Sequence, residues 1–166
     1  MPSFAVLDIP ALVAQLADAL RARGAMVATA ESCTGGLIAG ACTELSGSSD
    51  WFERGFVTYS NAAKTTLLGV SPELIAAHGA VSEPVVQAMA SGALTHAPVQ
   101  WAVAVTGVAG PNGGSPDKPV GTVWFGWAGP NGVSSECQRF DGDRSAVRQA
   151  ALEHALRGLL CGLDRG

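Results

Sequence analysis

The sequence predicts an α/β protein whose sheet is covered by helices on both faces. Segments in which apolar residues recur at helical spacing alternate with short apolar runs of strand length. One such run, residues 101–106, is typical of a buried central strand. Late in the chain, Gly129-Pro130-Asn131-Gly132 has the composition of a hairpin turn between two further strands. Interleaved helices and strands with a late hairpin indicate a mixed, mostly parallel sheet.

The first half of the chain is expected to contain four helices and two strands. The first helix ends near Gly24 and a short helix after residue 60 ends at Gly69, because glycine commonly follows the last residue of a helix. Asn61 is expected to be the N-cap of that short helix, and Ser71-Pro72 begins the next one. The predicted elements are the helix from 9 to near 24, strand 26–30, helix 37–45, strand 52–60, helix 61–68 and the helix that starts at 71.

The second half of the chain is expected to contain two long helices and three strands. Ser82-Glu83-Pro84 begins a helix with an apolar face, and Asp141-Gly142-Asp143-Arg144 precedes the last helix. The predicted elements are helix 84–94, strand 101–106, strand 120–127, strand 133–140 and the helix that starts at 144. No repeat or linker interrupts this order, so we expect a single domain over residues 1–166.

Composition and charge exclude several classes of protein. A chain of 166 residues with 48% apolar and 14% charged residues has the balance of a folded domain. Only ten Lys and Arg residues and a net charge of −4 argue against a nucleic-acid partner. The chain has no run of eighteen consecutive apolar residues, so no membrane span is expected. Asp8, Gln15 and Asp18 interrupt the N-terminal segment, which therefore lacks the apolar core of a signal peptide. The four cysteines form no C-x-x-C pair, which indicates reduced thiols, a cytoplasmic protein and no zinc site.

The run Glu31-Ser32-Cys33-Thr34-Gly35-Gly36 lies where a predicted strand meets a predicted helix. Open α/β sheets bind ligands at this edge, and a helix N-terminus offers unpaired N–H groups to an anion. Ser32 is the first candidate nucleophile, and the N–H groups around Thr34, Gly35 and Gly36 are candidate oxyanion donors. Alternatively, Ser32 and Thr34 only cap the helix while the glycines permit tight packing.

Cys33 is a second candidate nucleophile in the same run. A thiol is the better nucleophile at neutral pH, but alternation along the strand points Cys33 and Ser32 to opposite faces. A free cysteine among apolar residues usually belongs to a core.

A base for Ser32 is available in Tyr59-Ser60-Asn61-Ala62-Ala63-Lys64. Lys64 lies one turn into the predicted short helix, and a partly desolvated lysine can act as a base because its pKa falls. Tyr59 could relay or orient the proton. The alternative is a solvated lysine beside a half-buried tyrosine.

A third cluster follows the predicted central strand. Thr106-Gly107-Val108-Ala109-Gly110-Pro111 begins a loop with four glycines in nine residues, which can present N–H groups to a phosphate or serve only as a flexible connection. Arg144 could grip an anion with two hydrogen bonds, or pair with Asp141 or Asp143.

Together these motifs resemble the CinA C-terminal family over about residues 8–162. The resemblance is carried by Ala30-Glu31-Ser32-Cys33-Thr34-Gly35-Gly36, residues 47–61, Lys64, residues 78–82, residues 106–111, residues 121–123 and residues 142–144. It implies a three-layer α/β/α sandwich, a homo-oligomer and no metal or other cofactor. The chain looks like the stand-alone form of the family, and this resemblance implies hydrolysis of nicotinamide mononucleotide to nicotinate mononucleotide and ammonia.

The resemblance also assigns roles to residues. Ser32 would be the catalytic nucleophile, with Lys64 and Tyr59 as its activating partners, and Thr106 and Arg144 would belong to the active site. Around them, we expect the substrate to contact Glu31, Thr34, Gly35, Gly36, Asn61, Gly107, Ala109 and Gly110. Glu31 could instead order the turn. Two alternatives remain: a non-catalytic nucleotide-binding or regulatory module, and an amidase for a different small amide.

Overall fold

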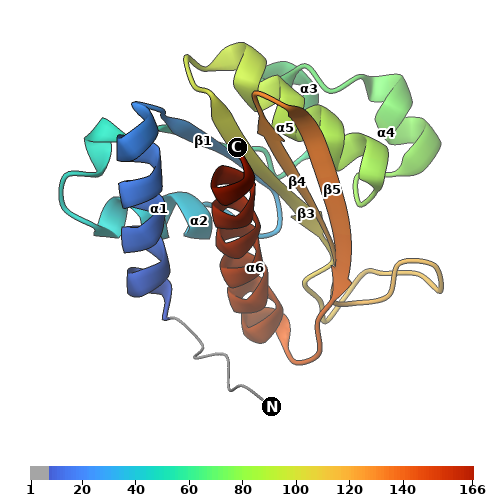
Figure 1. Ribbon diagram of the computed structural model, residues 1–166. Helices are drawn as coiled ribbons and strands as arrows, with labels where there is room; N and C mark the ends of the chain where they lie inside the picture. Colours follow the sequence, from blue (N-terminus) through green and yellow to red (C-terminus); the bar gives the residue numbers. More distant parts are fainter. Residues whose placement is uncertain (1–7) are drawn as a thin grey trace.

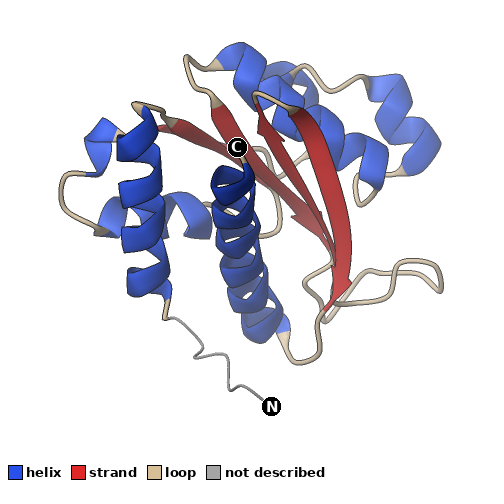
Figure 2. Cartoon of the chain, in the orientation of Figure 1, coloured by secondary structure: helices blue, strands red, loops and turns tan. Residues whose placement is uncertain are grey.

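The computed structural model describes residues 8–166, which fold into one five-stranded sheet between two layers of helices (Figures 1 and 2). The strands lie in the order β2-β1-β3-β4-β5. Helices α1, α2 and α6 cover one face and α3, α4 and α5 cover the other, so the predicted α/β/α sandwich is confirmed. The first seven residues of the expected domain lie outside the described range.

The sheet is mixed, as predicted. Strand β1 pairs in parallel with both β2 and β3, while β4 pairs antiparallel with β3 and β5 antiparallel with β4. Four strands therefore run in one direction and only β4 runs against them. The strands are β1 (Val27–Glu31), β2 (Phe52–Val57), β3 (Trp101–Gly107), β4 (Thr122–Gly129) and β5 (Gly132–Arg139).

The helices begin and end close to the predicted positions. The last helix extends beyond Leu159, the last apolar residue of the predicted face, and ends at Arg165, with Leu163 of its last turns also buried. The helices are α1 (Ile9–Arg23), α2 (Leu37–Glu44), α3 (Asn61–Leu68), α4 (Pro72–His78), α5 (Glu83–His96) and α6 (Arg144–Arg165), with a 3₁₀ turn η1 at Ser48–Asp50.

Two apolar cores lie on the two faces of the sheet. Alternation along β3 sends Val103 and Val105 towards α1 and α6, and Ala102 and Ala104 towards α5. The alanines on the α5 side leave room for that helix to approach the sheet closely. At Gly126 of β4, an added Cβ would lie only 2.8 Å from a main-chain oxygen of α5.

Two local expectations at turns had different outcomes. The hairpin is confirmed, because Gly129 pairs with Gly132 and only two residues form the turn. The N-cap of α3 is not Asn61 but Ser60, whose hydroxyl accepts the Ala63 N–H at 3.0 Å. Asn61 is the first helical residue, because the first hydrogen bond of the helix already forms between the Lys64 N–H and the Ser60 carbonyl.

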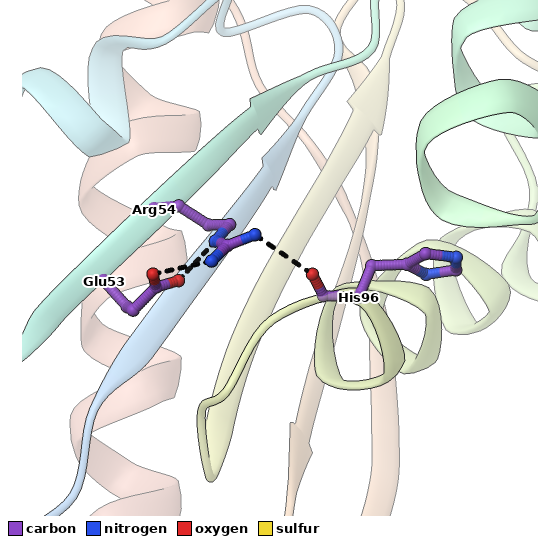
Figure 3. A network of polar contacts seen from close by, with 3 residues as sticks. All are labelled: Glu53, Arg54 and His96. Carbon is purple, nitrogen blue, oxygen red and sulfur yellow. Dashed lines mark hydrogen bonds and ion pairs between the residues drawn. The ribbon is translucent and has the colours of Figure 1, made fainter.

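The edge strand β2 is tied to the C-terminal end of α5 (Figure 3). Arg54 donates to the Glu53 carboxylate and, at 3.3 Å, to the carbonyl of His96, the last residue of α5. A cation at this position interacts favourably with the helix dipole.

The order of the strands fixes where a ligand can bind. From β1 the chain passes through α2 to β2 on one side, and from β2 it returns through α3, α4 and α5 to β3 on the other side. The carboxyl ends of β1, β2 and β3 therefore form a topological switch point. No helix within residues 8–166 is both long and apolar enough to cross a membrane.

Candidate active site

The three clusters singled out in the sequence meet at the carboxyl ends of β1, β2 and β3. A pocket of about 190 Å³ lies there. Its walls come from the turn after β1, the segment between β2 and α3, the segment before α5, the end of β3 with the loop that follows it, and the start of α6: Ser32, Cys33, Tyr59, Ala80, Val81, Thr106, Gly107, Ala109 and Arg144.

Alternation at the end of β1 separates Ser32 from its neighbours. Glu31 points to the α2 side, where its carboxylate accepts hydrogen bonds from the N–H groups of Ile38 and Ala39 at 2.9 and 3.0 Å. Ser32 points to the opposite side, where its hydroxyl meets Lys64 of α3. The predicted opposition of adjacent side chains is therefore observed, and it aims Ser32 at a base.

Lys64 is buried, with 1% of its surface exposed, so the alternative of a solvated lysine is wrong. Its Nζ lies 3.0 Å from Ser32 Oγ, 2.9 Å from the Thr58 carbonyl oxygen and 3.2 Å from the Tyr59 carbonyl oxygen. Burial lowers the pKa of the Lys64 amine from its ordinary value, because the ammonium loses hydration.

These three contacts define what Lys64 can do. Carbonyl oxygens only accept hydrogen bonds, so Thr58 and Tyr59 take two N–H groups from Lys64 in either protonation state. The third contact is with a hydroxyl, which can both donate and accept. A neutral Lys64 therefore turns its lone pair towards the Ser32 hydroxyl, which is the arrangement that a general base requires.

The adjacent thiol is poorly suited to nucleophilic attack. Cys33 packs with the core on the α1 and α6 side, and burial raises its pKa to about 11. At neutral pH this side chain is a thiol rather than a thiolate, and the thiolate is the reactive species. The geometry therefore favours Ser32 over Cys33.

Arg144 and Tyr59 form the open side of the pocket. The Arg144 guanidinium donates to the Gly110 carbonyl at 2.8 Å and to the Tyr59 hydroxyl at 3.2 Å. Neither Asp141 nor Asp143 pairs with Arg144, and Asp143 instead caps α6 by accepting the Ala146 N–H. A cation at the N-terminus of a helix opposes the helix dipole, so Arg144 contributes through these contacts and its charge rather than to helix stability.

Tyr59 is more exposed than the half-buried tyrosine that one interpretation of the sequence predicted. Its side chain is 62% exposed rather than half-buried. Its main-chain carbonyl holds Lys64, whereas its hydroxyl contacts Arg144. The phenol therefore lies on the ligand side of the pocket, and the main chain of the same residue lies on the side of the base.

The loop after β3 closes the pocket from a third direction. Thr106 is buried, and its hydroxyl donates to the Ala80 carbonyl at 3.0 Å, which ties the loop to the segment before α5. A second cavity, of about 440 Å³, adjoins the first at Ala109 and Arg144 and extends to the N-terminus of α6. A ligand that fills both cavities would have one end beside Ser32 and the other end at the N-terminus of α6.

Several predicted contact residues lie elsewhere. Glu31 and Thr34 are fully buried and bonded to each other at 2.6 Å, so the carboxylate orders the turn and does not face the pocket. The Gly35 N–H donates to the Ser32 carbonyl at 3.0 Å and is not free for an oxyanion. Gly36 is the N-cap of α2. Asn61 is exposed and lines a different cavity, because it is the first residue of α3 and points away from Ser32.

The sequence analysis missed Thr58, the Ala80-Val81 wall and Arg148. Thr58 and Ala80 act through main-chain carbonyls, which carry no signal in residue type. Arg148 donates to the carbonyls of Cys33 and Thr34 at 3.1 and 3.3 Å. Its spacing of four from Arg144 places both guanidinium groups on one face of α6, and that spacing was a usable signal.

A larger cavity lies away from this site. It measures about 610 Å³ and lies between β5 and the C-terminal half of α6, with Trp101, Trp127 and His154 among its walls. None of the residues predicted to act on a substrate lines it. Across residues 8–166, no three His, Cys, Asp or Glu side chains gather in a way that could hold a metal ion. All four cysteines are free thiols.

Comparisons with known proteins agree with this fold. The family model described as "CinA C-terminal domain" matches residues 10–163. Nicotinamide-nucleotide amidohydrolase PncC of Escherichia coli (strain K12) is 56% identical over 155 residues, which cover 92% of this chain and 93% of that protein. A protein of the same name from Pseudomonas putida is 56% identical over 152 residues, covering 92% and 95%.

Solved structures give the same result. The competence/damage inducible protein CihA from Agrobacterium tumefaciens superposes with a TM-score of 0.91 at 47% identity, covering 95% of this chain and 96% of that one. A CinA superfamily protein from Klebsiella pneumoniae 700603 superposes with a TM-score of 0.92 at 40% identity, covering 96% and 100%. On this sequence and structural similarity, the chain belongs to the CinA C-terminal domain family.

Proposed function

We propose that this protein is an amidohydrolase that converts nicotinamide mononucleotide to nicotinate mononucleotide and ammonia. The observation that carries the proposal is the buried contact of 3.0 Å between Lys64 Nζ and Ser32 Oγ at the floor of a pocket. The substrate is suggested by the relatives named nicotinamide-nucleotide amidohydrolase, which are 56% identical to this chain over nearly their whole length.

In the first half of the reaction, Ser32 Oγ attacks the carboxamide carbon and Lys64 Nζ takes the hydroxyl proton. The carbonyl electrons move to the oxygen, which main-chain N–H groups of the turn other than that of Gly35 would stabilise. The positive charge of the pyridinium ring withdraws electrons from the same carbonyl and favours the attack. The tetrahedral intermediate collapses as Lys64 returns the proton to the leaving nitrogen, which departs as ammonia.

In the second half, water attacks the ester formed on Ser32. Lys64 accepts a proton from the water, and the restored carbonyl expels Ser32 Oγ, which recovers its proton from Lys64. The product acid ionises to a carboxylate by releasing its proton to solvent, where ammonia can take it up, and the enzyme returns to its starting state. The same lysine acts as base and acid in both halves because it stays bonded to the Thr58 and Tyr59 carbonyls throughout.

The remaining pocket residues are proposed to bind the nucleotide. Arg144 has five N–H donors, of which the contacts to Gly110 and Tyr59 use two, so others are available for a phosphate. Thr106, Gly107 and Ala109 line the wall next to Ser32 and would shape the space for the ring. The adjoining cavity at the start of α6 would take the phosphate end.

The test is ammonia release from nicotinamide mononucleotide by the purified protein, with nicotinamide, nicotinamide riboside and a simple aliphatic amide as comparison substrates. Stoichiometric ammonia and nicotinate mononucleotide support the proposal. Saturable nucleotide binding without ammonia at any enzyme concentration would instead identify a binding or regulatory module. Faster turnover of another amide would identify a different amidase.

The expected homo-oligomer and the cytoplasmic location stay predictions. Light scattering on the purified protein measures the first, and fractionation of the source cells measures the second.

A further inference from the structure

Arg148 makes two hydrogen bonds to the turn that carries the nucleophile. Its Nε donates to the Cys33 carbonyl at 3.1 Å and its Nη2 donates to the Thr34 carbonyl at 3.3 Å. Both carbonyls belong to the two residues that follow Ser32, and the guanidinium comes from α6, more than 110 positions later in the chain. Hydrogen bonds from a charged donor are stronger than those between neutral groups.

These bonds fix the orientation of two successive peptide groups. A trans peptide is planar, so its N–H points opposite to its carbonyl. With the Cys33 and Thr34 carbonyls turned towards α6, the following N–H groups point back towards the sheet. One of them, the Gly35 N–H, donates to the Ser32 carbonyl at 3.0 Å and closes the turn. Arg148 therefore holds the turn in the conformation that this bond requires.

The glycine of the turn lies against the guanidinium. A Cβ added at Gly35 would lie 3.5 Å from Arg148 Nη2, an ordinary contact distance, so the space beside the arginine does not require glycine. The φ of +57° does favour it, and Gly35 therefore supplies the left-handed conformation of the turn that Arg148 holds.

The other side of the turn is held by a different element. Ser32 points away from α6 and meets Lys64 of α3, which is itself fixed by the Thr58 and Tyr59 carbonyls. The nucleophile thus lies between a base anchored on the α3 side and a turn anchored on the α6 side. The charge of Arg148 also reaches this turn, since it lowers the pKa of the Cys33 thiol against the larger effect of burial.

We infer that Arg148 is a positioning residue that aligns Ser32 with Lys64 and with the carbonyl that Ser32 attacks. This inference rests on the proposed serine mechanism. Arg148 does not line the Ser32 pocket, so it acts through the turn and not by contact with the substrate. Arg144, four residues earlier on the same helix, contacts the ligand side instead, and α6 thereby links the two halves of the site.

Three variants test this role. Arg148→Met removes both hydrogen bonds and keeps a long side chain, and Arg148→Lys keeps the charge but offers no planar fork for two carbonyls. Arg157→Met is the matched control, since Arg157 lies on the same helix and pairs with Glu153. The measurements are kcat and KM for nicotinamide mononucleotide, the rate at which a fluorophosphonate labels Ser32, and the melting temperature.

We expect Arg148→Met to lower kcat and the labelling rate by about 10²-fold with KM nearly unchanged, because a small misplacement of a reacting group has effects of this size. Arg148→Lys should fall between it and the wild type, and Arg157→Met should match the wild type. The labelling rate separates the two proposals: a wild type that labels at Ser32 but leaves the nucleotide intact contradicts the proposed substrate and still tests Arg148.

Three outcomes would overturn the inference. One is a folded Arg148→Met variant with wild-type kcat and labelling rate. Another is a change in KM alone, which would make Arg148 a substrate ligand. The third is a loss of kcat that follows the melting curve and disappears on cooling, which would make its role purely structural.

Discussion

Lys64 Nζ lies 3.0 Å from Ser32 Oγ, although 32 positions separate the two residues in the chain. The contact exists because β1 and β2 are neighbours in parallel register, so that the residues following both strands reach the same edge of the sheet. It joins a hydroxyl that is slightly open to a pocket with an amine whose residue is only 1% exposed. The predictions below follow from that pairing and from the groups that hold it.

Replacing Lys64 with arginine should strongly lower kcat although both side chains are basic. A guanidinium stays protonated in proteins and cannot accept the Ser32 proton. We expect kcat to fall by about 10²- to 10⁴-fold in Lys64→Arg and in Lys64→Met, the range that a general base contributes. Steady-state ammonia release measures it. Lys118→Arg, in an exposed loop where the lysine contacts the His78 carbonyl, is the control and should keep wild-type activity. Retention of activity in Lys64→Arg would exclude Lys64 as the base.

The pH profile of kcat should report the titration of Lys64. The base works when neutral, so kcat rises with pH as the amine loses its proton. Burial lowers the pKa of Lys64 from 10.5, so the midpoint of this rising limb should lie below 10.5. Initial rates over the pH range in which the fold is stable give the midpoint. A rate that falls over the same range, or that is flat, contradicts the role of a neutral lysine.

The fold could be predicted well from the sequence because its signals are local. Apolar runs such as 101–106 and the glycine-rich hairpin mark strands and turns directly. The position of Ser32 at a strand-to-helix joint is a signal of the same kind. The base could only be suspected, because burial of Lys64 depends on how α3 packs against the sheet.

The parts of the site that the sequence did not reveal are those built from main-chain atoms and from distant segments. Thr58 contributes a carbonyl to Lys64, and any residue type could do so. Glu31 was grouped with substrate ligands because it adjoins Ser32, but alternation along β1 turns it to the opposite face. Arg148 reaches the turn only because α6 crosses that face.

The hydroxyl of Tyr59 should affect binding more than chemistry. It contacts Arg144 at 3.2 Å, while the Lys64 amine is held by the carbonyl of the same residue. Loss of an exposed hydrogen bond of this type costs about 0.5–1.5 kcal/mol of binding free energy. In Tyr59→Phe we therefore expect KM to rise by about 2- to 10-fold with kcat within about twofold of wild type. A large loss of kcat with unchanged KM would instead make the phenol a proton carrier.

Glu31 should stabilise the fold by capping α2 from β1. The N-cap residue Gly36 has no side chain, and the Glu31 carboxylate supplies the missing acceptor to Ile38 and Ala39. We expect Glu31→Gln to lower the free energy of unfolding by about 1–3 kcal/mol, because an amide oxygen replaces a charged acceptor in a buried site. Urea unfolding measures it, and Glu44→Gln at the exposed end of α2 is the control. Equal stabilities of the two variants would rule out the capping role.

The most direct test of the central claim compares Ser32→Ala with Cys33→Ala in one assay of ammonia release from nicotinamide mononucleotide. Ser32 faces the base, whereas Cys33 packs in a core with a pKa of about 11. Loss of detectable turnover in Ser32→Ala, with Cys33→Ala close to wild type, is the predicted result. Full activity in Ser32→Ala, or loss only in Cys33→Ala, would contradict a serine mechanism.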